Sequence, residues 1–150
     1  MKIYIAADHA GYWLKENLKE DLRSYGHEVI DAGNNHYDPN DDYTDFVIPC
    51  AEKVAGDFGV MGIVIGRSGN GEAIAANKVN GIRAVLCLTE DMAKLARQDN
   101  NANVLALGSD FVDGHKAERI VSVFIDTPFP ENERHVRRID KINIYEDTRN

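Results

Sequence analysis

The sequence predicts an α/β fold: a three-layer α/β/α sandwich on a five-stranded, parallel, Rossmann-like sheet with an extra C-terminal helix. Apolar runs of strand length alternate with stretches of helical periodicity along the chain. Runs such as GIVIG and NVLALG are apolar at both odd and even positions, which is typical of strands covered on both faces of the sheet. With 150 residues, 43% of them hydrophobic, the chain can fill one core, so we expect residues 1–150 to form one domain.

The predicted elements alternate from the first residues onward, beginning with a strand–helix–strand unit. The predicted strands cover residues 2–8, 27–33, 60–66, 82–88 and 103–108. The predicted helices cover residues 12–26, 44–57, 72–79, 89–100 and 114–128. Pro49 in the second helix fits either its first turn or a kink, since proline lacks the N–H of a helix interior.

The last segment, PENERHVRRIDKINIYEDTRN (130–150), reads as a charged helix with a narrow apolar stripe. The stripe consists of Val136, Ile139 and Ile142, at helical spacing. A stripe this narrow, on a helix that follows the last strand, suggests packing against another subunit.

Composition and charge exclude several classes of function. A formal charge of −8 and a pI near 5.0 disfavour nucleic acid as a partner, because binding to a phosphate backbone depends on cations. No apolar run approaches the roughly 20 residues that span a bilayer, and MKIYIAADHAG has no signal-peptide pattern, so we expect no membrane association and a cytoplasmic protein. Cys50 and Cys87 lie in unrelated segments and are expected to be buried, reduced thiols.

Residues that follow the predicted strands are the first candidates for chemistry, because ligands gather beyond the carboxyl ends of such a sheet. They are Asp8, His9 and Gly11 after the first strand, residues 66–71 after the third, and Gly108, Ser109 and Asp110 after the fifth. Asp8 and His9 read either as a solvated strand end or as ligands for polar oxygens.

The glycine-rich loop GRSGNG joins a strand to a helix, a context in which backbone N–H groups can bind an anion. Its spacing is neither GxGxxG nor GxxxxGK[ST], and the next predicted strand ends at Leu86–Leu88 without the acid of a dinucleotide site, so a nucleotide is disfavoured. The glycines can serve a tight turn alone. Glu72, which follows, is either a helix-capping carboxylate or a base beside an oxyanion pocket that includes Ser68.

Arg134 and Arg138 are four residues apart and share one face of the last predicted helix. Such a run is usually a solvated or salt-bridged surface. The alternative is a fork for a phosphate group, for which arginine is well suited.

Five motifs together resemble the ribose-5-phosphate isomerase B family, which includes allose-6-phosphate and galactose-6-phosphate isomerases. They are DHAG (8–11), NDDY (40–43), SGNGEAIAANK (68–78), DNNANVLALG (99–108) and RHVRRID (134–140). The resemblance implies an aldose–ketose isomerase that works through an enediolate without a metal or cofactor. It also implies a small-molecule sugar or sugar-phosphate substrate and a homodimer with active sites at the interface, or a tetramer.

The resemblance also assigns residues to roles. Many members have a cysteine base where this chain has Gly66, but a branch with GGSGNGE uses the loop glutamate, here Glu72, to move a proton between C2 and C1. Ser68 and the N–H groups of Gly69, Asn70 and Gly71 would hold the enediolate oxygens. Asp8 would assist at the hydroxyls and Tyr43 would pack on the sugar. Asn100 would reach the sugar from the neighbouring subunit, and His9, Arg134 and Arg138 would bind the phosphate.

Three positions depart from the family pattern. Asp99 stands where a histidine commonly opens the sugar ring, and near its ordinary pKa of about 3.9 an aspartate would donate a proton poorly. Asp110 replaces a phosphate-binding arginine, and Arg67 replaces a glycine, where it would restore the lost cation or narrow the pocket. We hypothesise that the preferred substrate is not ribose 5-phosphate itself.

A four-carbon sugar 4-phosphate fits these changes, because its phosphorylated O4 cannot close a furanose ring. A hexose derivative and an unphosphorylated sugar are further candidate substrates. Two non-enzymatic alternatives are a nucleotide-sensing domain of the same architecture and a degenerate partner subunit of a heteromeric isomerase.

Overall fold

Five parallel strands form one sheet in the order β2-β1-β3-β5-β4, as the computed structural model of residues 1–148 shows. The strands are β1 (Lys2–Ala7), β2 (Glu28–Asp31), β3 (Met61–Gly66), β4 (Ala84–Leu86) and β5 (Val104–Gly108). The predicted α/β/α sandwich and its parallel sheet are therefore confirmed. β2 and β4 are shorter than predicted because they are the two outer strands, each paired along one edge only.

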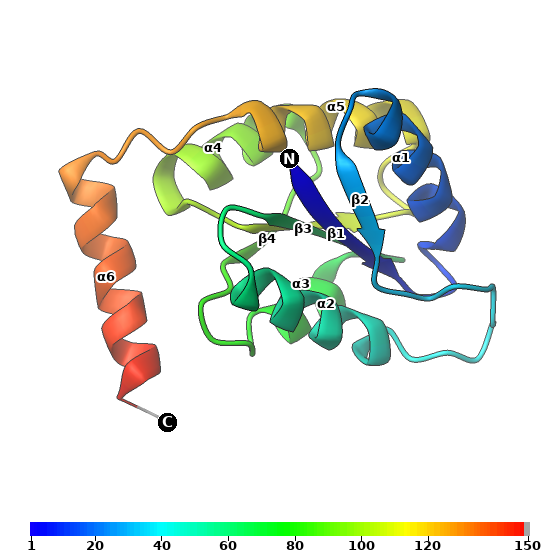
Figure 1. Ribbon diagram of the computed structural model, residues 1–150, viewed down its shortest axis with the longest axis horizontal. Helices are drawn as coiled ribbons and strands as arrows, with labels where there is room; N and C mark the ends of the chain where they lie inside the picture. The colour runs from blue at the N-terminus through cyan, green and yellow to red at the C-terminus, as the bar shows by residue number, and fades with distance from the viewer. Residues whose placement is uncertain (149–150) are drawn as a thin grey trace.

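Helices cover both faces of the sheet (Figure 1). They are α1 (Tyr12–Ser24), α2 (Thr44–Gly56), α3 (Asn70–Ala76), α4 (Glu90–Asn100), α5 (Gly114–Asp126) and α6 (Glu133–Asp147). One core lies under α1, α4 and α5, and a second lies under α2 and α3. Pro49 lies inside α2, past the first turn, where the buried side chains of Val47, Cys50 and Ala51 hold the helix on the sheet.

The central strands β3 and β5 are buried along their whole length, as their apolar sequences predict. Their register places Gly66 opposite Gly108, and β1 pairs with β3 so that Ala7 lies opposite Ile65. The carboxyl ends of the three strands therefore lie side by side. β2 lies on one side of β1 in the sheet, and β3 lies on the other side. The loops after β1 and β3 therefore run in opposite directions. The crevice between these two loops is the expected ligand site.

α3 begins at Asn70, two residues before the predicted start, because the loop turns into the helix at Gly69. Gly69 has φ +80°, and a Cβ there would lie 2.6 Å from Leu86 Cδ1. A side chain would meet both a strained backbone and the neighbouring strand, so the turn requires glycine.

α6 contributes no buried residue, and its principal contact with the rest of the chain is to α4. Figure 1 shows it standing apart from the sandwich, beyond the amino-terminal ends of the strands. Ile142 is 47% exposed and Ile144 62% exposed. Of the predicted stripe, Ile142 is therefore exposed in one chain, whereas Val136 and Ile139 are partly covered. The last two residues of this predicted helix, Arg149 and Asn150, lie outside the described residues.

Cys50 and Cys87 are both buried and unpaired, as predicted, and burial raises the pKa of each thiol to about 12. Among residues 1–148, none of the helices combines the length and apolar character needed to cross a membrane.

Candidate active site

Glu72 lies in the first turn of α3 at the carboxyl end of the sheet, with 3% of its surface exposed. Within the described residues its Oε2 atom has no hydrogen-bond partner. Burial raises the pKa of this carboxyl group, and the negative charge of Asp8 adds to the rise, while backbone N–H groups of Glu72 and Gly69 oppose it. A carboxylate with a raised pKa and a free oxygen can accept a proton, which a capping residue has no need to do.

The carboxylate of Glu72 packs against Gly66, the last residue of β3. A Cβ at Gly66 would lie 1.8 Å from Glu72 Oε1 and 2.2 Å from its Cδ. The glycine therefore leaves the space that the carboxylate fills. A side chain at position 66 would occupy the space of the Glu72 carboxylate. Glu72 can adopt this conformation only because residue 66 is glycine.

The loop between β3 and α3 carries the predicted oxyanion-binding groups. Ser68 Oγ accepts a hydrogen bond from the backbone N–H of Asn70 at 3.3 Å. The Tyr43 ring lies over Gly71, where a Cβ would be 2.8 Å from its Cζ. The structure therefore brings Tyr43, from the start of α2, against the first turn of α3, which contains Glu72 and directly follows the loop with Ser68.

Asp8 and His9 follow β1 beside this loop. Asp8 is 8% exposed, and its Oδ1 accepts hydrogen bonds from the backbone N–H groups of Ala10 and Gly11 at 3.0 and 3.2 Å. Its influence on the Glu72 pKa indicates that the two carboxylates face one region. Asp8 is thus held by backbone N–H groups at the predicted position.

His9 has a partner that the sequence analysis did not identify. Its Nδ1 lies 2.6 Å from Asp41 Oδ1, and its backbone N–H donates to the same oxygen at 3.0 Å. The hydrogen bond with Asp41 is the main cause that raises the pKa of His9. The available signal was the pair of acids before Tyr43 in NDDY, although nothing local tells which of the two reaches His9.

Asp8, His9 and Asp41 also form a cluster whose potential metal-ligating atoms lie within 4.8 Å of one another. The His9 and Asp41 atoms are 2.6 Å apart, the separation of a direct hydrogen bond. Asp8 Oδ1 is already bonded to backbone N–H groups. Direct hydrogen bonds account for these contacts, and we assign no metal ligand here.

Arg67 and Asp110, two of the departures from the family pattern, lie next to each other. Arg67 Nε is 3.8 Å from Asp110 Oδ2, with both side chains mostly exposed. The backbones of the two loops are joined by bonds from Ser109 N to Gly66 O (2.8 Å) and from Asp110 N to Arg67 O (3.0 Å). The arginine charge also lowers the pKa of His9, so Arg67 lies on the same rim of the crevice. The two changes therefore partly neutralise each other.

The other predicted residues are not brought to Glu72 within one chain. Asp99 and Asn100 end α4, which leads into the amino end of β5, so they lie at the opposite edge of the sheet from Glu72. Asp99 Oδ1 lies 3.5 Å from His135 Nε2 of α6, the helix that carries Arg134 and Arg138. Within one chain these residues therefore lie apart from the Glu72 site.

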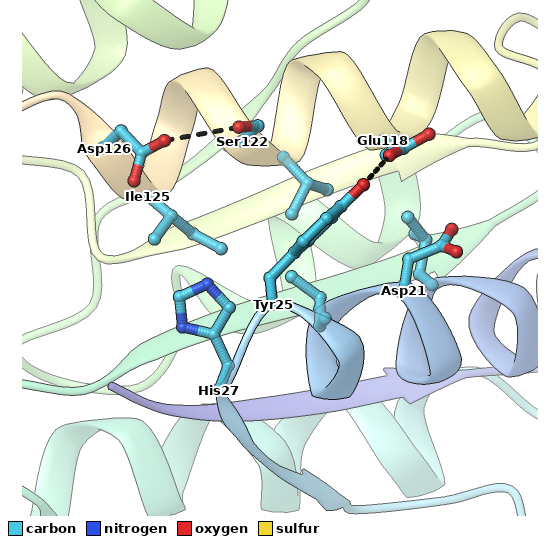
Figure 2. Close-up of a pocket in the computed structure, with 10 residues that line it drawn as sticks. Asp21, Tyr25, His27, Glu118, Ser122, Ile125 and Asp126 are labelled. Carbon is cyan, nitrogen blue, oxygen red and sulfur yellow. Dashed lines mark hydrogen bonds between the residues drawn. The ribbon is translucent and has the colours of Figure 1, made fainter.

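Figure 2 shows a separate hollow between α1 and α5. Tyr25 donates a hydrogen bond to Glu118, and Ser122 lies 3.3 Å from Asp126. None of the predicted site residues lines this hollow, so it is not the candidate active site.

The contact of Gly66 with Glu72 predicts a steric coupling. Gly66→Ala should lower the free energy of unfolding by about 1–3 kcal/mol, because the new methyl group displaces the buried carboxylate. In a Glu72→Ala background the same change should cost much less. Urea denaturation of the four proteins measures this, and an equal cost in both backgrounds would contradict it. Gly56→Ala is the control, since a Cβ there meets nothing within 4 Å.

The raised pKa of Glu72 predicts a pH-dependent stability difference. Because the folded protein holds this proton more tightly than the unfolded chain, the contribution of Glu72 to stability falls as pH rises through its folded-state pKa. Glu72→Gln should therefore be more stable than the unsubstituted protein at neutral pH. The gain should vanish below the ordinary value of 4.5. Thermal unfolding across pH tests it; Glu52→Gln, on the exposed side of α2, should show no comparable gain.

Comparisons with known proteins agree with this geometry. The model of the family described as Ribose/Galactose Isomerase matches residues 3–142. The chain is 47% identical over 148 residues to ribose-5-phosphate isomerase B of Mycobacterium tuberculosis (strain CDC 1551 / Oshkosh), covering 99% of this chain and 91% of that protein.

Solved structures give the same result. Ribose-5-phosphate isomerase B from Mycoplasma genitalium, with bound ribulose-5-phosphate, has a TM-score of 0.93 and 46% identity, covering 97% of this chain and 96% of that one. Ribose-5-phosphate isomerase B of Clostridium thermocellum has a TM-score of 0.94 and 42% identity, covering all of both chains. The chain therefore belongs to the ribose/galactose isomerase family, as an aldose–ketose isomerase of the ribose-5-phosphate isomerase B type.

Proposed function

We propose that the chain interconverts an aldose phosphate and a ketose phosphate through an enediolate, with Glu72 as the base. The observation that carries this proposal is the buried carboxylate of Glu72, whose Oε2 has no partner among residues 1–148. The raised pKa makes it a stronger base than an exposed glutamate. Its position at the carboxyl ends of β1 and β3 is where a ligand reaches it.

In the aldose-to-ketose direction, Glu72 takes the proton from C2 and returns it to C1, while the O2 proton leaves and O1 gains one. Negative charge develops on these oxygens in the transition state. The hydroxyl of Ser68 and the N–H groups of Gly69, Asn70 and Gly71 would stabilise that charge. For this the substrate oxygens would replace Ser68 Oγ as the acceptor of the Asn70 N–H, and Glu72 as the acceptor of the Gly69 N–H. Asp8 would hold the hydroxyl groups through its remaining oxygen.

A sugar phosphate is the substrate class that the relatives support, because the Mycoplasma genitalium enzyme holds ribulose-5-phosphate. In this chain His9 and Arg67 supply positive charge on the rim of the Glu72 site. Asn100, Arg134 and Arg138 would complete the phosphate and sugar contacts from the second subunit of a homodimer. A tetramer built from such dimers would keep the same sites.

Two side-chain contacts favour a second candidate substrate. Asp99 lies beside His135 and Asp110 beside Arg67, so neither acid is placed as a ready proton donor or phosphate ligand. A tetrose 4-phosphate, which cannot form a furanose ring through O4, would need no ring-opening acid. Hexose phosphates and unphosphorylated sugars complete the set to be compared with ribose 5-phosphate.

Glu72→Gln should reduce kcat/KM by about 10²–10⁴-fold on the best substrate, because the amide cannot accept the C2 proton. A panel of ribose 5-phosphate, tetrose 4-phosphate, hexose 6-phosphate and unphosphorylated sugars, assayed for ketose formation in D₂O, identifies that substrate. Solvent deuterium should enter the product only with the unsubstituted enzyme.

Glu52→Gln is the matched control, and circular dichroism shows whether each variant is folded. Retained turnover by folded Glu72→Gln would refute its role as base. Clearly best turnover on ribose 5-phosphate would reject the altered-substrate candidate. A protein inert on every sugar would favour a partner subunit, and saturable nucleotide binding would favour a sensing domain.

The dimer proposal predicts that Ile139→Glu yields a monomer with little activity, because a charge on the apolar stripe opposes burial of α6 against its partner. Light scattering gives the mass, and the same assay gives the activity. Phe58→Glu, at a fully exposed side chain outside α6, should leave both unchanged. A fully active monomer would show that the site does not depend on a second subunit.

A further inference from the structure

Lys15 of α1 is completely buried, yet it has no part in the proposed chemistry. Its Nζ donates to both carboxylate oxygens of Asp31, at 2.9 and 2.8 Å, and to the main-chain oxygen of Asn34. A buried ammonium group is costly unless it is paired and hydrogen-bonded. Here the pairing is made with the end of β2 and the loop that follows it, so Lys15 holds that loop in place.

Asn34 transmits this anchoring toward the site. Only 2% of the residue is exposed, and its backbone N–H donates to the oxygen of Ala7, at the end of β1, at 2.9 Å. Its side-chain Nδ2 donates to Asp41 Oδ2 at 2.6 Å. Asn34 is thus tied to α1 and β1 through its backbone and presents its amide to Asp41.

Asp41 uses its second oxygen to hold His9. Its side chain is 7% exposed, and Oδ1 accepts from both the backbone N–H and the Nδ1–H of His9. Because a carboxylate can only accept, the proton of this bond belongs to His9 Nδ1. Nε2 is then the ring nitrogen left for a ligand on a side chain that is 30% exposed.

The charges around His9 act in both directions. Asp41 and Asp8, whose Oδ2 is 3.9 Å from Nδ1, favour the imidazolium, whereas Arg67 and partial burial disfavour it. The hydrogen bond to Asp41 has the largest effect, and the resulting pKa of His9 is raised. The ring therefore keeps its positive charge to a higher pH than a free histidine.

We propose that Asp41 is a positioning residue, which orients the His9 ring so that its Nε2–H meets the phosphate of the substrate. Asn34 and Lys15 hold Asp41 in place from the protein interior. This inference rests on the proposed function in one respect, the binding of phosphate by His9. Asp41 could also serve only to hold two loops together. In that case phosphate binding would not depend on the charge of Asp41, whereas in the positioning role it does.

Asp41→Asn tests the proposal, since asparagine keeps the shape and one acceptor but loses the charge. The pKa of His9 should fall, so the cation is lost at a lower pH. KM for the best sugar phosphate, and the inhibition constant of inorganic phosphate, should rise by about 3- to 10-fold near pH 7.5 and approach the unsubstituted values near pH 5.5. kcat should change little. Asp45→Asn, on the exposed start of α2, removes the same charge and should leave all these values unchanged.

NMR titration of the His9 ring, assigned by comparison with His9→Gln, gives a readout independent of activity. It should titrate above about 6.5 in the unsubstituted protein and shift on addition of inorganic phosphate. A His9 pKa at or below that value, or an Asp41→Asn effect on KM that is the same at every pH, would overturn the proposal. If Asp41→Asn does not fold, the titration of the unsubstituted protein decides. If no sugar is turned over, the proposed function fails, while the phosphate titration still tests His9.

Discussion

The carboxylate of Glu72 occupies the space that a side chain at Gly66 would need, and the arrangement of the site follows from this contact. A Cβ at Gly66 would lie 1.8 Å from Glu72 Oε1, so the last residue of β3 must lack a side chain for the carboxylate to pack against it. The same packing removes Glu72 from water and raises its pKa. The register of β3 with β1 and β5 then sets Asp8 on one side of this carboxylate and the loop at Ser109 on the other. One missing side chain thus creates both the position and the basicity of the proposed base.

Charge on the rim of the crevice is arranged locally, against the −8 net charge of the chain. Positive charge there comes from Arg67 and from His9 when its ring is protonated, and each lies beside an acid, Asp110 and Asp41 respectively. The two pairs differ in kind. Asp41 is nearly buried and tied to Asn34, so its interaction with His9 is specific and weakly screened, whereas the exposed Arg67–Asp110 pair is worth little in water. Arg67 is therefore the less constrained of the two cations and is free to turn toward a ligand.

The proposed site divides between opposite edges of the sheet. Glu72, Ser68 and Asp8 lie at the carboxyl ends of the strands, while Asn100 ends α4 before β5, and α6 stands beyond the amino ends (Figure 1). α6 has no fully buried side chain in its own chain, and Ile142 of its apolar stripe is 47% exposed, so the stripe would gain free energy by covering another surface. A second copy would cover the stripe and deliver Arg134 and Arg138 in one step, which couples assembly to phosphate binding in the proposed dimer.

The sequence predicted the parallel α/β sandwich, because alternating apolar runs and helical periodicity are local properties of the chain. It also placed GRSGNG and Glu72 at a strand-to-helix turn, and the family motifs singled out Tyr43, which the structure lays over Gly71. The folded structure was needed to show that β2 and β4 are short, that Gly66 makes room for Glu72, and that Asp110 lies beside Arg67. It also revealed Asp41 as the partner of His9 and Asn34 as the link to Lys15. These contacts join residues that are 6 to 43 positions apart, and no local pattern of hydrophobicity or spacing sets such distances.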